Sequence, residues 1–78
     1  MDEQKKTGIC KRIRQIRLID LEMNQVEFAK AVGTSQGIIS QIESGEKLPT
    51  MEVFCNIVEV AKERSADWIL NGIDFNIT

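Results

Sequence analysis

The sequence predicts an all-α fold, a compact bundle of five short helices followed by a short segment with strand periodicity. Residues that cap helices recur at short intervals and precede apolar runs with a helical period. Glycines or a proline follow most of these runs and mark helix ends. The 78 residues are 42% hydrophobic and 28% charged, which is typical of one small soluble domain with a single core.

The first predicted helix spans residues 9–20, where Ile9, Ile13 and Ile16 recur at the helical spacing i, i+4, i+7. Lysines and arginines lie between these isoleucines, so the helix is amphipathic. We predict that residues 1–8 form a flexible basic arm and that residues 9–72 form the folded domain.

Local signals bound the second and third predicted helices. Asn24 and Glu27 have the spacing of a capping box at the start of the second helix, and Gly33 ends it at the C′ position. Ser35 is the expected N-cap of the third helix, which ends at Gly45. Both helices are therefore short, and a tight turn joins them.

The fourth and fifth predicted helices follow Pro49, which disfavours helical conformation in the residue before it. Thr50 caps the fourth helix, Ser65 caps the fifth, and Gly72 follows the end of the fifth. The apolar faces of these two helices carry Met51, Phe54, Ile57, Val58 and Ala61, then Trp68 and Ile69. Five short helices with brief connections make a compact bundle.

Residues 73–78 alternate apolar and polar side chains, with Ile73, Phe75 and Ile77 at every second position. A single strand would leave its edge exposed, but two copies of the chain can pair such strands across a two-fold axis. In the alternative interpretation, these apolar side chains fold back onto the fourth and fifth helices. The segment is thus a candidate dimerisation strand, with both interpretations open.

Composition argues against an enzyme and against a metal site. Histidine, the commonest general base and metal ligand, is absent. Cys10 and Cys55 lie far apart without a CxxC motif, so we expect two reduced, mostly buried thiols, with a disulfide as the alternative. We expect no metal and no cofactor. The polar start and the short apolar runs predict a cytoplasmic protein that does not enter a membrane.

Charge is unevenly distributed along the chain. The net charge is −2, yet residues 1–17 carry six basic and two acidic residues, and residues 18–78 carry four basic and ten acidic residues. Local charges set the field at a contact surface within a Debye length. An acidic average is therefore compatible with binding to a polyanion, although it weakens non-specific binding.

The stretch from Gln25 to Ser44 has the spacing of a helix-turn-helix. Ala29 is small where the second helix crosses, and Gly33 supplies the positive φ that redirects the chain. The apolar wedge between the two helices consists of Phe28, Val32, Ile39 and Ile42. A helix-turn-helix presents the outer face of its second helix to the major groove of DNA.

These residues resemble the lambda-repressor/Cro family, also called the Xre family, of bacterial and phage regulators. The matching segments are residues 25–29 (QVEFA), 33–35 (GTS) and 39–45 (ISQIESG), then Pro49 and residues 67–72 (DWILNG). The resemblance covers about residues 9–72 and implies the five-helix fold, double-stranded DNA as partner and an ion pair between Arg17 and Glu43.

Two segments depart from the family pattern. Residues 18–23 lack the glycine that is usual between the first two helices, and they are one residue longer. Residues 62–64 likewise stand where the family commonly has a glycine, again with about one extra residue. We expect these differences to change local turn geometry and helix ends but not the fold.

The outward face of the predicted third helix carries uncharged polar side chains. The candidates for reading bases are Gln36, Gly37, Ile38, Ser40 and Gln41. A glutamine can pair bidentately with adenine, and an isoleucine can contact a thymine methyl group. A glycine within a helix costs about 1 kcal/mol relative to alanine. The presence of Gly37 in the third helix is explained either by close approach to the duplex or by chance. The alternative is a solvated polar face.

Phosphate contacts position such a domain without reading sequence. The candidates are Gln25, Ser44, Lys47, Lys5 and Lys6. Gln25 begins the second helix, where free amides and the helix dipole favour an anion. The basic arm with Lys5 and Lys6 is either a phosphate contact or a terminus that only aids solubility.

The predicted function is that of a sequence-specific transcriptional regulator, a phage or bacterial repressor that binds operator DNA as a homodimer. Two copies are expected because one copy makes few base contacts, whereas a dimer reads half-sites about one helical turn apart. The alternative is an antitoxin-like or adaptor module whose main partner is a protein. The acidic C-terminal half of the chain favours this alternative.

Overall fold

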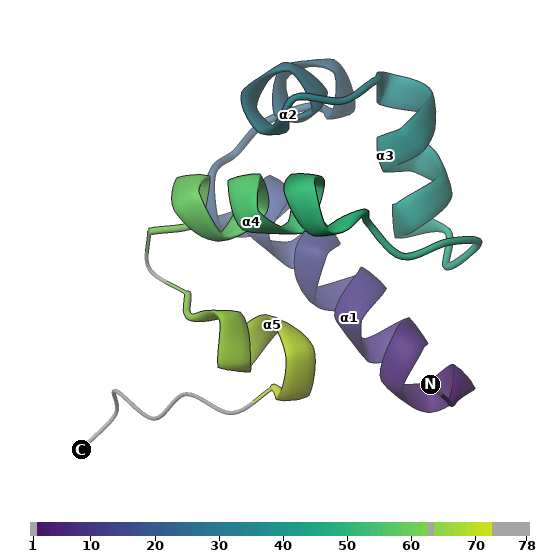
Figure 1. The fold of residues 1–78 in the computed structure, drawn as a ribbon. Helices are drawn as coiled ribbons and strands as arrows, with labels where there is room; N and C mark the ends of the chain where they lie inside the picture. The colour runs from purple at the N-terminus through teal and green to yellow at the C-terminus, as the bar shows by residue number, and fades with distance from the viewer. Residues whose placement is uncertain (1, 63, 73–78) are drawn as a thin grey trace.

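The computed structural model describes residues 2–62 and 64–72, and every regular element in it is helical (Figure 1). The elements are α1 (Glu3–Gln15), the π-helical turn η1 (Ile16–Asp20), α2 (Gln25–Val32), α3 (Gln36–Glu43), α4 (Met51–Val60) and α5 (Ala66–Asn71). The predicted all-α bundle of five helices is confirmed. The predicted strand at residues 73–78 lies outside the described residues.

The expected N-caps of α2 to α5 are all present. At α2, Asn24 Oδ1 accepts from the Glu27 amide at 2.8 Å and Glu27 Oε1 accepts from the Asn24 amide at 2.9 Å, which completes the capping box. The hydroxyls of Ser35, Thr50 and Ser65 each accept from the amide three residues further along the chain. These caps satisfy amides that have no partner inside their helices.

The N-terminal helix is longer than predicted, since α1 begins at Glu3 rather than at residue 9. Asp2 is its N-cap and accepts from the Lys5 amide at 2.7 Å. The expectation of a flexible arm is therefore wrong for residues 3–8, which are helical. An N-cap and an acidic first turn stabilise a helix start without any apolar period. The apolar pattern of the sequence shows only the part of α1 that contacts the core.

The extra residue between α1 and α2 is accommodated by η1. The Leu21 amide donates to the Ile16 carbonyl and the Met23 amide to the Arg17 carbonyl, each at 2.9 Å. Such wide turns insert one residue into a helix. The extra residue therefore does not change which side of α1 faces the core or the direction in which Arg17 points. After η1, Glu22 adopts a left-handed conformation with φ of 52°, at the segment where the family usually has a glycine.

Replacing Glu22 with glycine should stabilise the domain by about 0.5–1 kcal/mol. The side chain of Glu22 is exposed, and a non-glycine residue in the left-handed region is sterically unfavourable, although glycine also raises the entropy of the unfolded chain. Urea unfolding followed by circular dichroism measures this difference. Lys30→Gly within α2 is the control and should instead lose about 1 kcal/mol. Equal losses for both variants would contradict the assignment of strain to Glu22.

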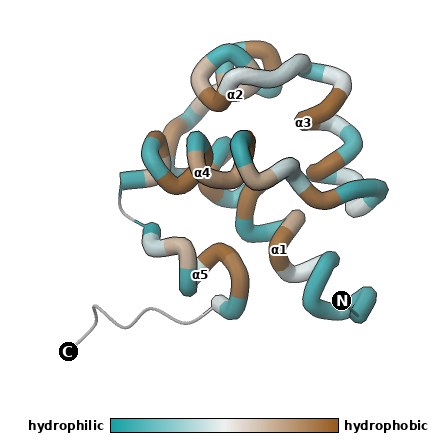
Figure 2. The backbone as a smooth tube through the Cα atoms, in the orientation of Figure 1, coloured by the Kyte–Doolittle hydropathy of each residue, from teal (hydrophilic) through white to brown (hydrophobic). Residues whose placement is uncertain are grey.

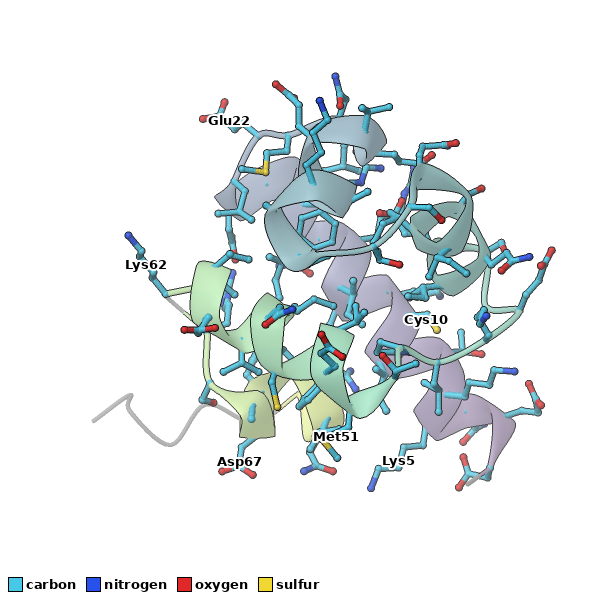
Figure 3. The ribbon with its side chains drawn as sticks, turned by 45° about the horizontal axis from the view of Figure 1, so that its top comes forward. Lys5, Cys10, Glu22, Met51, Lys62 and Asp67 are labelled. Carbon is cyan, nitrogen blue, oxygen red and sulfur yellow. The ribbon has the colours of Figure 1, made fainter. Side chains whose placement is uncertain are left out.

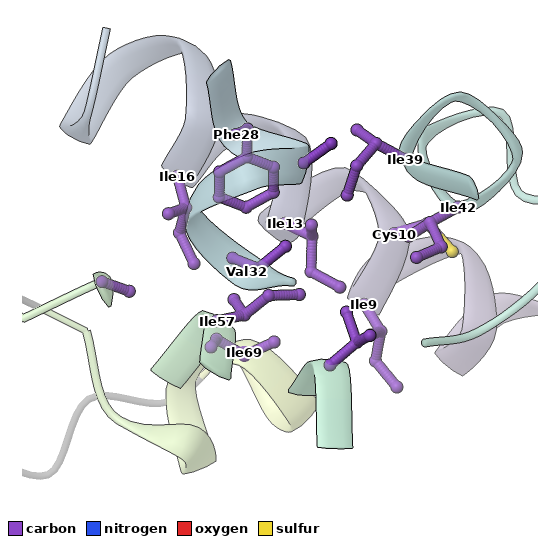
Figure 4. Packing of buried hydrophobic residues seen from close by; sticks show 13 residues of the cluster. Ile9, Cys10, Ile13, Ile16, Phe28, Val32, Ile39, Ile42, Ile57 and Ile69 are labelled. Atoms are coloured by element: carbon purple, nitrogen blue, oxygen red, sulfur yellow. The ribbon is translucent and has the colours of Figure 1, made fainter. Parts of the chain in front are cut away.

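One hydrophobic core lies between all five helices (Figure 4). Figure 2 shows hydrophilic first turns in α1, whereas hydrophobic and hydrophilic residues alternate along α4 and α5. The buried hydrophobic residues are Ile9, Cys10, Ile13, Ile16, Phe28, Ala29, Val32, Ile39, Ile42, Val53, Ile57, Ala61 and Ile69. The prediction for α4 was wrong at Met51, which is 76% exposed. Val53 is buried in its place, because the first turn of α4 lies at the rim of the core.

The fifth helix is held by an arginine of α1. Arg12 donates from Nε to the Ile69 carbonyl at 2.7 Å and from Nη2 to the Leu70 carbonyl at 3.1 Å. These carbonyls belong to the end of α5, where a cation is favoured by the helix dipole. A Cβ atom at Gly8 would lie 3.0 Å from Arg12 Nη2, so a glycine at this position leaves room for the guanidinium.

The two cysteines differ in exposure, and both are free thiols. Cys10 is buried, as expected, but the prediction of a mostly buried thiol is wrong for Cys55, which is exposed on α4. The Cys10 thiol donates to the Lys47 carbonyl at 3.8 Å. Burial raises the pKa of Cys10, and the nearby charge of Lys6 acts in the opposite direction.

We expect Ellman's reagent to react rapidly with Cys55 in the folded protein and with Cys10 only on unfolding. The raised pKa keeps the Cys10 thiol neutral in the fold. The contribution of the neutral Cys10 thiol to stability is complete below the pKa of a cysteine in the unfolded chain, about 8.5. This contribution is lost as the pH rises through the higher pKa that Cys10 has in the folded protein. Absorbance kinetics at pH 8, with Cys55→Ser as control, measure both rates. Equal rates for the two thiols in native protein would contradict this expectation.

Candidate nucleic-acid interface

The α2 and α3 helices and their tight turn form a rigid unit at one end of the bundle (Figure 1). Gly33 has φ of 75°, and the next amide, that of Thr34, donates to the Ala29 carbonyl at 2.9 Å. The wedge between the helices is fully buried and consists of Phe28, Ala29, Val32, Ile39 and Ile42. This packing fixes the direction of α3 and leaves its outer side exposed.

The predicted base-reading residues lie mainly on this outer side of α3. Gln36, Gly37, Ser40 and Gln41 are exposed, whereas Ile38 is half-buried and packs against the core. A Cβ atom at Gly37 would meet its nearest neighbour, the Ser35 hydroxyl, only at 3.9 Å. Packing within the chain therefore does not require a glycine at this position of α3.

A buried carboxylate on α3 connects this helix to η1 and to the chain before α2. Glu43 accepts two hydrogen bonds from Arg17, at 2.6 Å from Nε and 2.8 Å from Nη2. Their side chains are 5% and 8% exposed, respectively. The hydrogen bond to Glu43 raises the pKa of Arg17, against the opposing effect of burial. Arg17 also donates to the Met23 carbonyl at 2.9 Å, so the guanidinium holds the chain before α2 as well.

The same carboxylate orients two glutamines at the surface. Gln25 donates from Nε2 to Glu43 at 3.2 Å, and Gln25 Oε1 accepts from Gln36 Nε2 at 2.6 Å. Gln25 was predicted as a phosphate contact, and the structure places its side chain between Glu43 and Gln36. Each glutamine amide still has a second N–H that can donate to a ligand. The two side chains are therefore held in place before any ligand arrives.

Arg14 is a candidate that the sequence did not reveal. Its Nε lies 3.8 Å from Glu43 Oε1, and its side chain is 61% exposed. Arg14 lies on α1, one turn before Arg17 of η1, at the edge of the α2–α3 surface. Its spacing from Arg17 was visible in the sequence, but only the tertiary contact with Glu43 distinguishes it from the other basic residues of α1.

The predicted phosphate contacts divide into two groups. Ser44 and Lys47 are exposed at the end of α3 and in the loop that follows, and Lys6 Nζ donates to the Glu46 carbonyl of that loop at 3.2 Å. Lys5 extends on the side of the molecule where Met51 lies, away from α3 (Figure 3). The structure thus gathers Lys6, Ser44 and Lys47 near the end of α3, but not Lys5.

Within residues 2–62 and 64–72, no three cysteine or acidic side chains are grouped so that they could hold a metal ion. In the same residues, no helix combines the length and apolar character that crossing a membrane requires.

Two short helices packed through a glycine turn, with a polar exposed face on the second, define a helix-turn-helix domain. The family model described as helix-turn-helix matches residues 13–69 of the chain. The chain belongs to this lambda-repressor-like, or Xre, helix-turn-helix family and is a DNA-binding regulator in kind. No solved structure matches the chain.

Proposed function

We propose that the chain is a sequence-specific repressor of phage or bacterial genes that binds operator DNA as a homodimer in the cytoplasm, with α3 in the major groove. The observation that carries this proposal is the network that holds Gln36. Gln36 is exposed on α3, and its amide bonds to Gln25, which is held by the buried pair of Glu43 and Arg17. A preorganised side chain loses little entropy on binding.

In the proposed complex, the exposed residues of α3 read base edges. Gln36 and Gln41 offer amides that suit adenine, and Ser40 offers a hydroxyl. Gly37 allows the backbone of α3 to approach the duplex closely, and the exposed part of the half-buried Ile38 contacts a thymine methyl group. Base readout of this kind requires α3 to enter the groove with its outer side forward.

The proposed phosphate contacts surround this reading surface. Gln25 lies at the N-terminus of α2, where the helix dipole favours an anion, and Arg14 lies beside it. At the other end of α3, the DNA backbone is contacted by Lys47, Ser44 and Lys6. Lys5, which lies away from α3, is not part of this proposed surface.

The second candidate is an antitoxin-like or adaptor module with a protein partner. It is favoured by the exposed acidic side chains of α4 and α5, which are Glu52, Glu59 and Asp67. An acidic surface of this kind repels DNA and attracts basic partners. The two candidates are compatible, because this surface and α3 belong to different helices.

Selection of bound duplexes from random DNA at about 100 mM salt tests the proposal, since specific binding persists at salt that weakens non-specific contacts. We expect a two-fold symmetric motif whose half-sites lie about one helical turn apart. Recovery of no motif, with binding that disappears as salt rises, would reject the repressor and leave the protein-binding candidate.

Lys47→Ala should weaken binding to all sequences alike and lower the slope of log K against log salt by about 0.9, the loss of one phosphate contact. Fluorescence anisotropy of labelled duplexes between 50 and 200 mM salt, a range in which such slopes are measurable, gives both quantities. Lys62→Ala is the matched control, because Lys62 follows α4 on the side away from α3 (Figure 3). An unchanged slope for Lys47→Ala would show that Lys47 does not contact a phosphate.

A further inference from the structure

One exposed face of the molecule, on α1 and η1, combines cations with apolar side chains. Lys11, Arg14, Gln15, Leu18 and Ile19 line an open depression there. Leu18 is 43% exposed and Ile19 67% exposed, although both are large and apolar. The cations lie at the N-terminal end of this face and the apolar pair at its C-terminal end. We call this surface the basic face.

A second exposed face, on α4, has the opposite charge. Met51, Cys55 and Glu59 are exposed at the helical spacing i, i+4, i+8, and Glu52 is exposed beside Met51. Met51 is 76% exposed, so this face also presents a large apolar side chain. Here the apolar residue lies at the N-terminal end and Glu59 lies two turns later. We call this surface the acidic face.

The two faces are complementary only when their helices run antiparallel. The basic face from Lys11 to Leu18 and the acidic face from Met51 to Glu59 are each about 10–12 Å long, from the rise per residue of a helix. An antiparallel pair places Glu59 opposite Lys11 and Met51 opposite Leu18. A parallel pair would instead place Met51 against Lys11 and Glu59 against Leu18, which leaves both charges beside apolar groups.

These faces cannot meet within one chain. α1 buries Ile9 and Ile13 in the core and α4 buries Val53 and Ile57 in the same core, so their exposed faces point outward in different directions. In Figure 1, α1 passes behind α4. The occupant that fits the basic face is therefore the acidic face of a second copy. Such a contact is heterologous, because each copy contributes a different surface.

We propose that copies of this chain associate head to tail, with the basic face of one copy against the acidic face of the next. Faces two turns long bury less area than a standard stable interface, so the association is weak in free solution. It becomes effective where copies bind side by side on DNA, which raises their effective concentration. Only this last consequence rests on the proposed function. The contact itself does not require DNA.

Sedimentation of the protein without DNA tests the contact directly. We expect the average mass to rise with protein concentration, past that of any closed dimer, and to rise less at high salt because the pairs are exposed charges. Lys11→Glu and Glu59→Lys, which each create like-charge pairs, should each weaken association at least about tenfold. Mixing the two variants, or combining both substitutions in one chain, should restore it, since the opposite charges then meet again.

Two controls make the result decisive. Lys30→Glu changes the net charge as Lys11→Glu does, but lies on the exposed side of α2, and it should associate like the original protein. Circular dichroism confirms the fold of each variant. Unchanged association in the single variants, or no recovery in the mixture, would overturn the proposal. A failed DNA selection with intact charge-dependent association would instead reject the repressor function alone.

Discussion

Arg17→Met should lower the free energy of unfolding by about 3–5 kcal/mol, because it leaves Glu43 buried without its partner. A domain of this size has about 4–12 kcal/mol in total, by the usual stability per residue. The variant is therefore expected to lose a large share of the total stability. The hydrogen bond from the guanidinium to the Met23 carbonyl is lost as well.

Urea unfolding at pH 7 measures this loss. Arg14→Met is the matched control, because Arg14 is 61% exposed and lies 3.8 Å from the same carboxylate. We expect it to cost less than about 1 kcal/mol. The double variant Arg17→Met with Glu43→Leu should recover much of the stability, since it removes the buried charge together with its partner. A loss below about 1 kcal/mol for Arg17→Met alone would show that the pair does not hold the fold.

Gln36→Ala and Gln41→Ala should each lower affinity for the selected operator by about 5- to 150-fold while leaving affinity for random duplexes nearly unchanged. These factors correspond to the 1–3 kcal/mol that a base contact contributes. Gln36 should show the larger effect, because it is held by Gln25 before binding, whereas no such bond fixes Gln41. Gln4→Ala, at an exposed glutamine near the start of α1, is the control.

Anisotropy titrations of operator and random duplexes at one salt concentration give the two affinities for each variant. Equal losses on both duplexes would show that these glutamines contact the backbone rather than bases, and α3 would no longer be the reader. Gln25→Ala should lower affinity for both duplexes, because its own phosphate contact is lost. It should lower affinity for the operator further, because Gln36 is then no longer held in place.

Local sequence patterns predict some of the helix boundaries of this chain but not all of them. The capping box of Asn24 and Glu27 and the left-handed Gly33 were predicted, because caps and turns depend on residues within four positions of one another. The start of α1 was missed, since its N-cap Asp2 lies seven residues before Ile9, the first isoleucine of the apolar pattern. An apolar period shows only the part of a helix that is buried.

The candidate site was predictable in its residues but not in its connections. The outward positions of α3 follow from the helical period, and the pairing of Arg17 with Glu43 was implied by the family resemblance. The link from Glu43 through Gln25 to Gln36, and the position of Arg14 beside it, join residues of three helices. Side chains that meet across helices leave no periodic signal along the chain.

The order of the helices, the caps of α2 to α5 and the helix-turn-helix could be predicted from the residues alone, because each depends on short-range hydrogen bonds and on a repeating apolar pattern. Three features became apparent only in the folded chain: the exposure of Met51 and Cys55, the η1 turn that accommodates the extra residue, and the contact of Arg12 with the end of α5. The physical reason is that exposure and long-range contacts depend on how neighbouring helices pack. That packing is set by the summed shape of the core rather than by any one segment.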